Sequence, residues 1–181
     1  MNKKIAIVGT VGLPQNYGGF ENLVDNLTKT LNSQYDFTVY CSSKSYKSKL
    51  KYFNKSKLKY INISPNGISS VFYDIVSMIH ACRYADAILI LGVSGCIFLP
   101  FLRIISGCKI IVNIDGVEWK RQKWNLFAKS FLKFSEKIAV KYAHNIIADN
   151  LSIVEYIKLE YNKKSDLIAY GGDHVKKINL S

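Results

Sequence analysis

Residues 4–31 read KIAIVGTVGLPQNYGGFENLVDNLTKTL, and they predict a strand, a glycine-rich loop and a helix. Residues 5–8 form a continuous apolar run, which is typical of a strand that is covered on both faces in a parallel sheet. The loop that follows contains Gly12, Gly18 and Gly19. Glycine supplies positive φ and lets a ligand approach the backbone closely. Apolar residues then recur at helical spacing up to the end of the stretch.

The start of this helix offers free backbone N–H groups, which favour an anion such as a phosphate or carboxylate. The glycine spacing does not match the G-x-G-x-x-G dinucleotide fingerprint, and the expected second strand does not end in the acidic residue that this fingerprint needs. The sequence also lacks a G-x-x-x-x-G-K-[ST] phosphate loop. NAD and ATP are therefore poor candidates. Spacing alone leaves open whether the glycines serve a ligand or only make the turn.

The composition predicts a single domain with one good core, because half of the 181 residues are apolar. The net charge of +12 indicates an anionic partner, such as a membrane surface, a pyrophosphate ligand or nucleic acid. An AT-rich genome would produce the same excess of lysine without any functional demand. The three histidines make no metal-ligand spacing. The cysteines occur singly and predict free thiols in a reducing cytoplasm; they are Cys41, Cys82, Cys96 and Cys108.

Strand patterns alternate with helical patterns along the rest of the chain. Further strands are expected at residues 36–41, 58–63, 88–91, 109–114, 145–148 and 166–169. This alternation predicts an α/β fold, a Rossmann-like three-layer α/β/α domain with a mostly parallel sheet of about seven strands. Ligands bind such sheets at the carboxyl ends of the strands. The glycine loop, residues 92–95, residues 113–119, Asp149 and Asn150 are therefore expected on one rim.

Residues 42–60 combine lysines with aromatic residues, and no acidic residue occurs between Asp36 and Asp74. This mixture suits an anionic lipid surface, nucleic acid or simply a solvated loop. Because the sequence has no recognised nucleic-acid-binding motif, we expect no nucleic-acid partner. Charged and helix-breaking residues interrupt the apolar residues 85–106, which predict a strand and a short helix rather than a membrane span.

The helix expected at residues 125–142 has two stripes. An apolar stripe is ordinarily core and a lysine stripe ordinarily faces solvent, but the combination also suits a helix lying on anionic lipid head groups. The apolar stripe is Leu126, Phe127, Phe131, Phe134, Ile138 and Tyr142, and the lysines are Lys129, Lys133, Lys137 and Lys141.

The loop wording GTVGLPQNYGGFE resembles the opening of bacterial polysaccharide glycosyltransferases of the rhamnosyltransferase type, which have a Gly-x-x-Gly-x-Pro segment followed by Tyr-Gly-Gly-Phe-Glu. The matching residues are Thr10, Gly12, Pro14, Tyr17, Gly18, Gly19, Phe20 and Glu21. The segment DGVEWKR at residues 115–121 is similar to a second motif of this family, and YGGDHV at residues 170–175 is a weaker echo of a third. The resemblance covers nearly the whole chain.

The resemblance implies the N-terminal, acceptor-binding half of a GT-B fold. It implies that residues 1–170 form this domain, that residues 171–181 begin an interdomain linker, and that a C-terminal donor-binding domain is absent from this chain. The implied activity is retaining and metal-independent transfer of a sugar from a nucleotide sugar, such as dTDP-rhamnose, to a lipid-linked oligosaccharide in capsule or O-antigen synthesis. The implied location is the cytoplasm, with peripheral binding to the inner face of the plasma membrane.

An alternative interpretation is a non-catalytic subunit that docks a lipid-linked acceptor or pairs with a separate catalytic chain. In the enzyme interpretation this chain alone is expected to be inactive, and no cofactor or metal is expected besides the nucleotide-sugar substrate.

The resemblance makes Asp115 the candidate catalytic residue, and a carboxylate at a strand end can bind a sugar hydroxyl or take its proton. Glu118 has the same chemistry, while Lys120 and Arg121 can hold a pyrophosphate. Asp115 as a turn cap and Glu118 as the partner of a lysine are the plainer interpretations. The candidate substrate-binding residues are Gly12, Tyr17, Gly18, Gly19, Glu21, Glu118, Lys120, Arg121 and Asn150.

Overall fold

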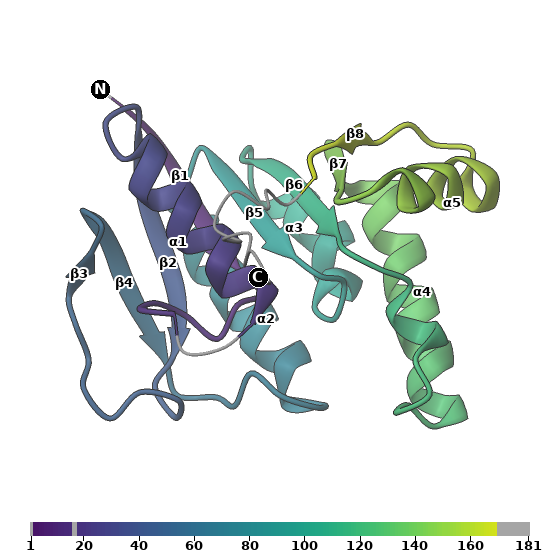
Figure 1. Ribbon diagram of the computed structural model, residues 1–181, viewed down its shortest axis with the longest axis horizontal. Helices are drawn as coiled ribbons and strands as arrows, with labels where there is room; N and C mark the ends of the chain where they lie inside the picture. The colour runs from purple at the N-terminus through teal and green to yellow at the C-terminus, as the bar shows by residue number, and fades with distance from the viewer. Residues whose placement is uncertain (1, 16–17, 170–181) are drawn as a thin grey trace, which may run out of the picture.

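A computed structural model describes residues 2–15 and 18–169 of the chain (Figure 1). Candidate residue Tyr17, the motif at residues 170–175 and the expected linker lie outside the described residues. The helices and strands are β1 (Lys3–Val8), α1 (Gly19–Leu31), β2 (Tyr35–Ser42), β3 (Tyr52–Phe53), β4 (Ser56–Ile61), α2 (Ser69–Ala81), β5 (Ala87–Leu91), η1 (Cys96–Phe98), α3 (Leu99–Ile105), β6 (Lys109–Ile114), η2 (Glu118–Lys120), α4 (Leu126–Tyr142), β7 (Asn145–Ala148), α5 (Leu151–Tyr161) and β8 (Asp166–Leu167).

One sheet organises the described residues, with the strand order β3-β4-β2-β1-β5-β6-β7-β8. All neighbouring strands pair in parallel except β3 and β4, which are antiparallel. The chain winds outward from β1 in both directions, so the strand order switches between β1 and β5. The predicted three-layer, mostly parallel α/β fold is confirmed.

The sheet has eight strands rather than about seven, because the lysine-rich segment contains β3. Tyr52 pairs with Lys57 and Phe53 with Ser56. Asn54 and Lys55 make the turn with φ of 48° and 61°. Two residues carry too little periodicity to predict a strand from sequence.

Both faces of the central strands are buried, as the apolar run in β1 predicts. Ala6 and Val8 belong to a core that includes buried residues of α2, α3, α4 and α5. Ile7 belongs to a second core on the opposite face, which includes Val24 of α1. Figure 1 shows α1 and α2 on opposite faces of the sheet.

The expectation that the apolar stripe of α4 is core is wrong for Leu126, Phe127 and Phe134, which are exposed. Residues that helical geometry places farther around the helix face the sheet instead. These buried residues are Leu132, Ser135, Glu136, Ala139 and Val140. The Ser135 hydroxyl donates a hydrogen bond to the Val93 carbonyl at 2.6 Å. This bond connects the buried face of α4 to the loop after β5.

The apolar residues 85–106 form β5, η1 and α3, in agreement with the prediction of a strand and a short helix. Within residues 2–15 and 18–169, no helix combines the length and apolarity needed to cross a bilayer. All four cysteines are free thiols, and three of them are buried.

Candidate functional site

A buried carboxylate holds the glycine loop in place. Glu21, in the first turn of α1, accepts hydrogen bonds from the Thr10 hydroxyl and the Val11 backbone N–H, each at 2.8 Å. Its side chain is only 5% exposed. The Glu21 side chain therefore organises the loop between β1 and α1, and its placement favours a structural role over direct ligand contact.

Two candidate glycines are required by close packing. Gly12 has φ of +131°, and a Cβ there would lie 2.6 Å from the Cys41 side chain. Gly18 has φ of +129°, and a Cβ there would collide with the Glu21 carboxylate. By contrast, a Cβ on Gly19 would meet no atom within 4 Å, and this residue opens α1. Gly19 is therefore the candidate glycine with open space beside it.

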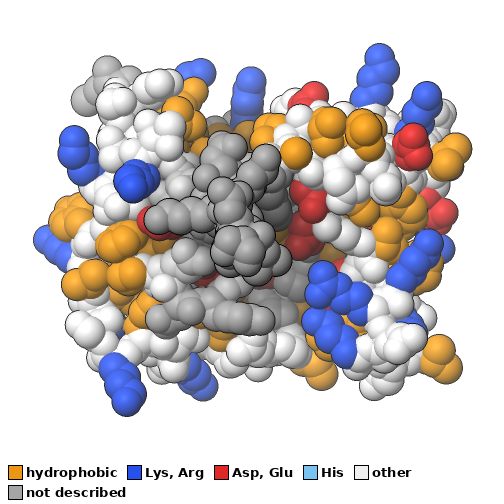
Figure 2. All heavy atoms as spheres, in the orientation of Figure 1, with side chains coloured by type: hydrophobic (Ala, Val, Ile, Leu, Met, Phe, Trp, Pro, Cys, Tyr) orange, Lys and Arg blue, Asp and Glu red, His pale blue; other side chains and the backbone are white. Residues whose placement is uncertain are grey.

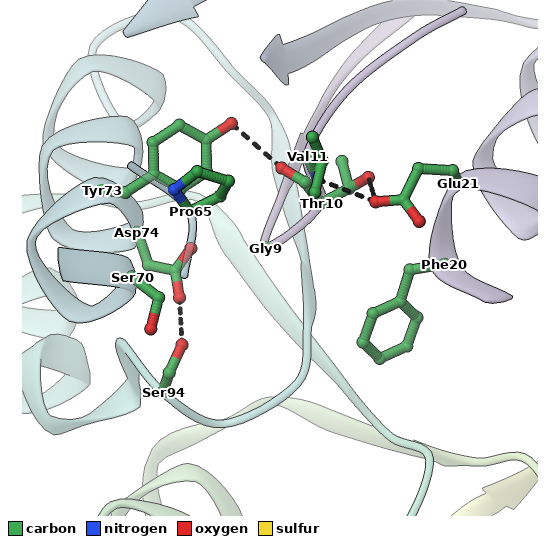
Figure 3. Close-up of a pocket in the computed structure, with 10 residues that line it drawn as sticks. All are labelled: Gly9, Thr10, Val11, Phe20, Glu21, Pro65, Ser70, Tyr73, Asp74 and Ser94. Carbon is green, nitrogen blue, oxygen red and sulfur yellow. Dashed lines mark hydrogen bonds between the residues drawn. The ribbon is translucent and has the colours of Figure 1, made fainter. Parts of the chain in front are cut away.

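A pocket of about 180 Å³ lies beside this loop (Figure 3). Its lining comes from the β1 loop, the start of α1, the segment after β4, the first half of α2 and the loop after β5. The lining residues are Gly9, Thr10, Val11, Phe20, Glu21, Pro65, Ser70, Tyr73, Asp74 and Ser94. The predicted meeting of the glycine loop with the loop after β5 is thus observed at the carboxyl edge of the sheet.

Asp74 is the titratable group of this pocket that sequence reasoning missed. The Ser94 hydroxyl donates a hydrogen bond to its carboxylate, and a Cβ on Gly95 would collide with its side chain. Burial raises the pKa of Asp74 to about 7, although hydrogen bonds from Ser94 and the Gly95 backbone favour the charged form. Asp74 can therefore hold or release a proton near neutral pH.

The pocket combines an aromatic ring with hydroxyl and carboxyl groups. In Figure 3 the Phe20 ring lies on the α1 side of the pocket, across from Asp74 and Ser94. The Tyr73 hydroxyl donates to the Thr10 carbonyl at 3.0 Å and so holds α2 against the loop. Among the residues of this lining that the structure describes, none is a lysine or arginine. This lining suits a neutral polar ring with hydroxyl groups, and the volume is smaller than the roughly 300–1,000 Å³ that encloses a drug-sized ligand.

Asp115 directly follows β6, the second strand from β1 on this rim. It is half-buried and is not among the residues that line the pocket. Burial raises the pKa of Asp115, the positive charge of Arg121 lowers it, and the charges of Asp149 and Glu118 raise it further. These mutual effects show that four charged groups of the predicted rim lie near one another: Asp115, Glu118, Arg121 and Asp149.

Glu118 forms the ion pair with a nearby lysine that the plainer interpretation of the sequence predicted, and a second ion pair with Arg121. Its carboxylate lies 2.8 Å from Arg121 Nε and 3.1 Å from Lys123 Nζ. The Trp124 indole N–H donates to the same carboxylate at 3.0 Å. Glu118 therefore fixes the conformation of the segment after β6 and positions the Arg121 guanidinium.

Lys120 is exposed and lies against two aromatic rings. Its Nζ is 5.4 Å from the Trp119 ring centre and 5.6 Å from that of Tyr156. The Trp119 indole N–H donates to the Tyr156 hydroxyl at 3.2 Å, and that hydroxyl donates to buried Glu136 of α4 at 2.6 Å. This chain of contacts anchors the segment after β6 to α4 and α5 and leaves the Lys120 ammonium at the surface.

Asn150 is the N-cap of α5. Its side-chain oxygen accepts a hydrogen bond from the Ile153 backbone N–H at 3.1 Å, and its amide donates to Asp149 at 2.7 Å. An N-cap of this kind stabilises a helix by about 1 kcal/mol. Asn150 lies on the predicted rim, and its side chain is engaged in these structural contacts.

Comparison with known proteins identifies the family of this chain. Residues 2–173 match the family model described as "Domain of unknown function (DUF1972)". The chain belongs to the DUF1972 family. No curated protein matches it significantly.

Among solved structures, the DUF1972 domain is similar to sucrose-phosphate synthase from Thermosynechococcus elongatus, with a TM-score of 0.73 and 13% identity over 94% of this chain and 48% of that one. It is also similar to Arabidopsis thaliana UGT89C1 complexed with UDP, with a TM-score of 0.55 and 13% identity over 94% of this chain and 52% of that one. The chain spans about half the length of these two proteins. At this identity the likeness establishes the fold, a Rossmann-like half of the GT-B architecture.

Asp74 and Tyr73 are the residues of the DUF1972 site that sequence reasoning missed, whereas Ser94 lies in the loop at residues 92–95 that was expected on the rim. The signal available for Asp74 is a lone acidic residue inside the largely apolar helix α2. Nothing in the sequence pairs it with Ser94, 20 residues away. That contact depends on β5 lying beside β1 and on α2 packing over both.

Proposed function

We propose that this DUF1972 domain is the acceptor-binding half of a retaining GT-B glycosyltransferase that transfers a sugar from a nucleotide sugar to a lipid-linked oligosaccharide. The proposal includes a donor-binding domain or partner subunit facing the carboxyl edge of the sheet. The observation that carries the proposal is the pocket between the glycine loop, α2 and Ser94, with its aromatic ring, hydroxyls and carboxyl group.

The pocket chemistry supports binding of one sugar ring of the acceptor. Phe20 offers an apolar face to the ring, and Asp74 and Ser94 offer hydrogen bonds to its hydroxyls. Protonated Asp74 donates a hydrogen bond and ionised Asp74 accepts one. A pKa near 7 makes both forms available at neutral pH.

The segment after β6 supplies the charged groups of the proposed site. Asp115 binds or deprotonates a hydroxyl, which its raised pKa favours, since a base is most effective when its pKa approaches the working pH. Lys120 and Arg121 hold the diphosphate of the acceptor, and the exposed Lys120 ammonium is available for this purpose.

UGT89C1, one of the similar structures, is also solved complexed with UDP-L-rhamnose, with a TM-score of 0.54, 11% identity and coverage of 95% of this chain and 49% of that one. A rhamnosyl donor is therefore compatible with a fold of this kind. The motifs at residues 9–21 and 115–121 support rhamnosyl transfer in capsule or O-antigen synthesis more specifically than the fold does.

An anionic membrane surface is the proposed platform, because a lipid-linked acceptor resides in a bilayer. α3 and α4 contact each other and both expose large apolar side chains. Ile104 is 82% exposed, Leu126 83% and Phe127 82%. Figure 2 shows Lys and Arg side chains beside hydrophobic ones on the side of the molecule where α4 lies. Exposed apolar residues flanked by lysines suit binding to anionic lipid.

The proposal is tested with the native full-length protein, labelled nucleotide sugars that include dTDP-rhamnose, and a short-chain lipid-diphosphate saccharide. We expect labelled sugar on the lipid acceptor. Phe20→Ala is expected to raise the acceptor KM about tenfold, because the ring loses its apolar contact surface. Phe72→Ala, which removes an exposed ring outside the pocket, is the matched control and is expected to leave KM unchanged.

Two results would contradict the proposal: absence of transfer from every nucleotide sugar, or equal effects of the two phenylalanine substitutions. Acceptor binding that weakens with Phe20→Ala in a protein without transfer activity would instead favour the non-catalytic binding subunit.

A further inference from the structure

A second and larger pocket lies at the amino ends of the strands, at the opposite edge of the sheet from the glycine loop. It has a volume of about 620 Å³. Lys4 near the start of β1, Lys57 in β4 and His80 in α2 contribute to its lining. We call it the amino-edge pocket, and its lining residues are Lys4, Asn32, Tyr35, Asp36, Phe37, Thr38, Tyr52, Lys55, Ser56, Lys57, Lys59, His80 and Tyr84.

Positive charge is concentrated in this pocket. Among its described lining residues are four lysines, Lys4, Lys55, Lys57 and Lys59, and one carboxylate, Asp36. Within the part of the chain that the structure describes, none of these lysines forms an ion pair. Like charges gathered in a concave surface repel one another and raise the local concentration of anions.

The alternating directions of side chains along β4 explain only part of this gathering of lysines. Leu58 packs into the core beside α1, so its neighbours Lys57 and Lys59 must point to the other face. A solvated strand face would need no more than these two residues. Lys4 from β1, Lys55 from the β3–β4 turn and His80 from α2 converge on the same pocket without being forced there by that pattern.

A hydrogen-bonded chain beneath the pocket orients His80. The Tyr40 hydroxyl lies 2.6 Å from His80 Nδ1 and 3.2 Å from the Tyr84 hydroxyl. Donation from the Tyr40 hydroxyl to Nδ1 would place the ring proton on Nε2 and make that nitrogen an N–H donor. His80 and Tyr84 both line the pocket.

Burial and neighbouring charges shift the pKa of His80. Burial lowers the pKa of His80, and the positive charges of Lys59, Arg83 and Lys57 lower it further. Tyr40 remains an uncharged phenol, because burial raises its pKa far above its ordinary value. An anion that neutralises the lysines would therefore raise the pKa of His80.

We propose that the amino-edge pocket binds an anion carrying two or more phosphate groups, with its lysines and His80 on the phosphates and its tyrosine rings against the attached group. The volume lies within the roughly 300–1,000 Å³ range of sites for drug-sized ligands. This site is independent of the proposed glycosyltransferase site, because it lies at the other edge of the sheet. The phosphates belong either to a free ligand or to a lipid head group.

Calorimetric titration of the purified chain with inorganic pyrophosphate tests the proposal. Lys57→Gln/Lys59→Gln is expected to weaken binding at least tenfold. Lys47→Gln/Lys49→Gln removes the same charge from exposed residues outside the pocket and is expected to change binding less than twofold. Lys4 and Lys55 line the pocket from two other parts of the chain. Lys4→Gln/Lys55→Gln is therefore expected to weaken binding by a similar factor to Lys57→Gln/Lys59→Gln.

NMR of the His80 ring provides a second readout, because pyrophosphate is expected to raise its titration midpoint. Vesicles that contain cardiolipin, whose head group carries two phosphates, form the second arm, and binding lost in Lys57→Gln/Lys59→Gln but kept in the control pair would assign the phosphates to lipid. No binding of either probe at millimolar concentration would overturn the proposal. Equal weakening by the pocket pair and the control pair would also overturn it, since binding would then depend on net charge alone.

Discussion

Asp115 is the residue with the most direct proposed role in the reaction. We expect Asp115→Asn in the native full-length protein to lower sugar transfer at least a hundredfold, the lower limit for loss of a general acid or base. Asparagine is nearly isosteric, so the thermal unfolding midpoint is expected to change little. Transfer assays and a melting curve on the same preparation give both values.

Asp166→Asn is the matched control for this substitution, because Asp166 is an exposed carboxylate in β8 and lines neither pocket. It is expected to retain full transfer activity. Normal turnover by Asp115→Asn would refute the chemical role of Asp115 and leave it as a turn residue after β6.

Asp74 predicts a pH dependence of stability. Its native pKa of about 7 lies above the ordinary value of 3.8, so between these values the unfolded chain releases a proton that the native state retains. Stability therefore falls as pH rises through this window, by about 1.4 kcal/mol per pH unit. Asp74→Asn removes this effect, and from pH 5 to pH 8 its unfolding free energy should rise relative to the parent by about 3 kcal/mol.

Urea unfolding of both proteins at the two pH values measures this difference. A constant difference between Asp74→Asn and the parent would show that the carboxyl group of Asp74 titrates normally in the folded protein.

Gly12 and Gly19 form a matched pair for the glycine loop. Gly12→Ala places a methyl group 2.6 Å from Cys41 at φ of +131° and is expected to destabilise the fold by about 2–4 kcal/mol. Gly19→Ala meets open space at the start of α1 and is expected to be neutral or stabilising by about 0.5–1 kcal/mol. Denaturant midpoints measure both effects, and equal midpoints would contradict the packing argument.

At the scale of elements, α4 has an unusual division of its faces. Its apolar stripe is partly exposed, while a face that includes Ser135 and Glu136 is buried. The exposed lysines Lys133 and Lys137 lie on the same helix. We infer that this combination serves an anionic bilayer rather than the protein core.

Replacement of Lys129, Lys133, Lys137 and Lys141 together by Gln is expected to weaken binding to phosphatidylglycerol vesicles at least tenfold, at about 1 kcal/mol per lysine before losses from imperfect contact. Vesicle sedimentation measures the binding. A control with Lys3, Lys158, Lys163 and Lys164 replaced by Gln removes the same charge elsewhere on exposed positions.

The apolar part of the same surface is tested by Leu126→Ser/Phe127→Ser, which is expected to weaken vesicle binding further. Leu159→Ser is its control, because Leu159 is 85% exposed on a different helix, α5. Vesicle binding unchanged by the α4 substitutions would leave both stripes as solvated surface.

At the scale of the whole molecule, the chain corresponds to about half of each two-domain protein that it resembles. We expect the protein recovered from its own cells to have an intact mass about twice 20.5 kDa, the size of two such domains. Mass spectrometry of the native protein measures this value. A mass near 20.5 kDa would direct the search to a partner subunit that copurifies with it.

Much of the rim could be predicted, because parallel strands bring their carboxyl ends to one edge whatever the details of packing. The glycine loop, the loop after β5 and Asp115 were found in this way. Local contacts such as the Glu118 ion pairs could also be anticipated, since the partners lie within five residues. Asp74 could not be linked to Ser94, because their contact depends on the packing of α2 against β5.

The sequence by itself determined the order of strands and helices apart from β3, the glycine loop, and the apolar run that gives β1 two buried faces. These features follow from local periodicity and from backbone conformations that only certain residues adopt. The tertiary structure alone decided which face of α4 is buried, how burial raises the pKa of Asp74, and where the lysines of β1, β4 and the β3–β4 turn meet. Burial and electrostatics depend on distances between residues far apart in the chain, and these distances are set only when the elements pack.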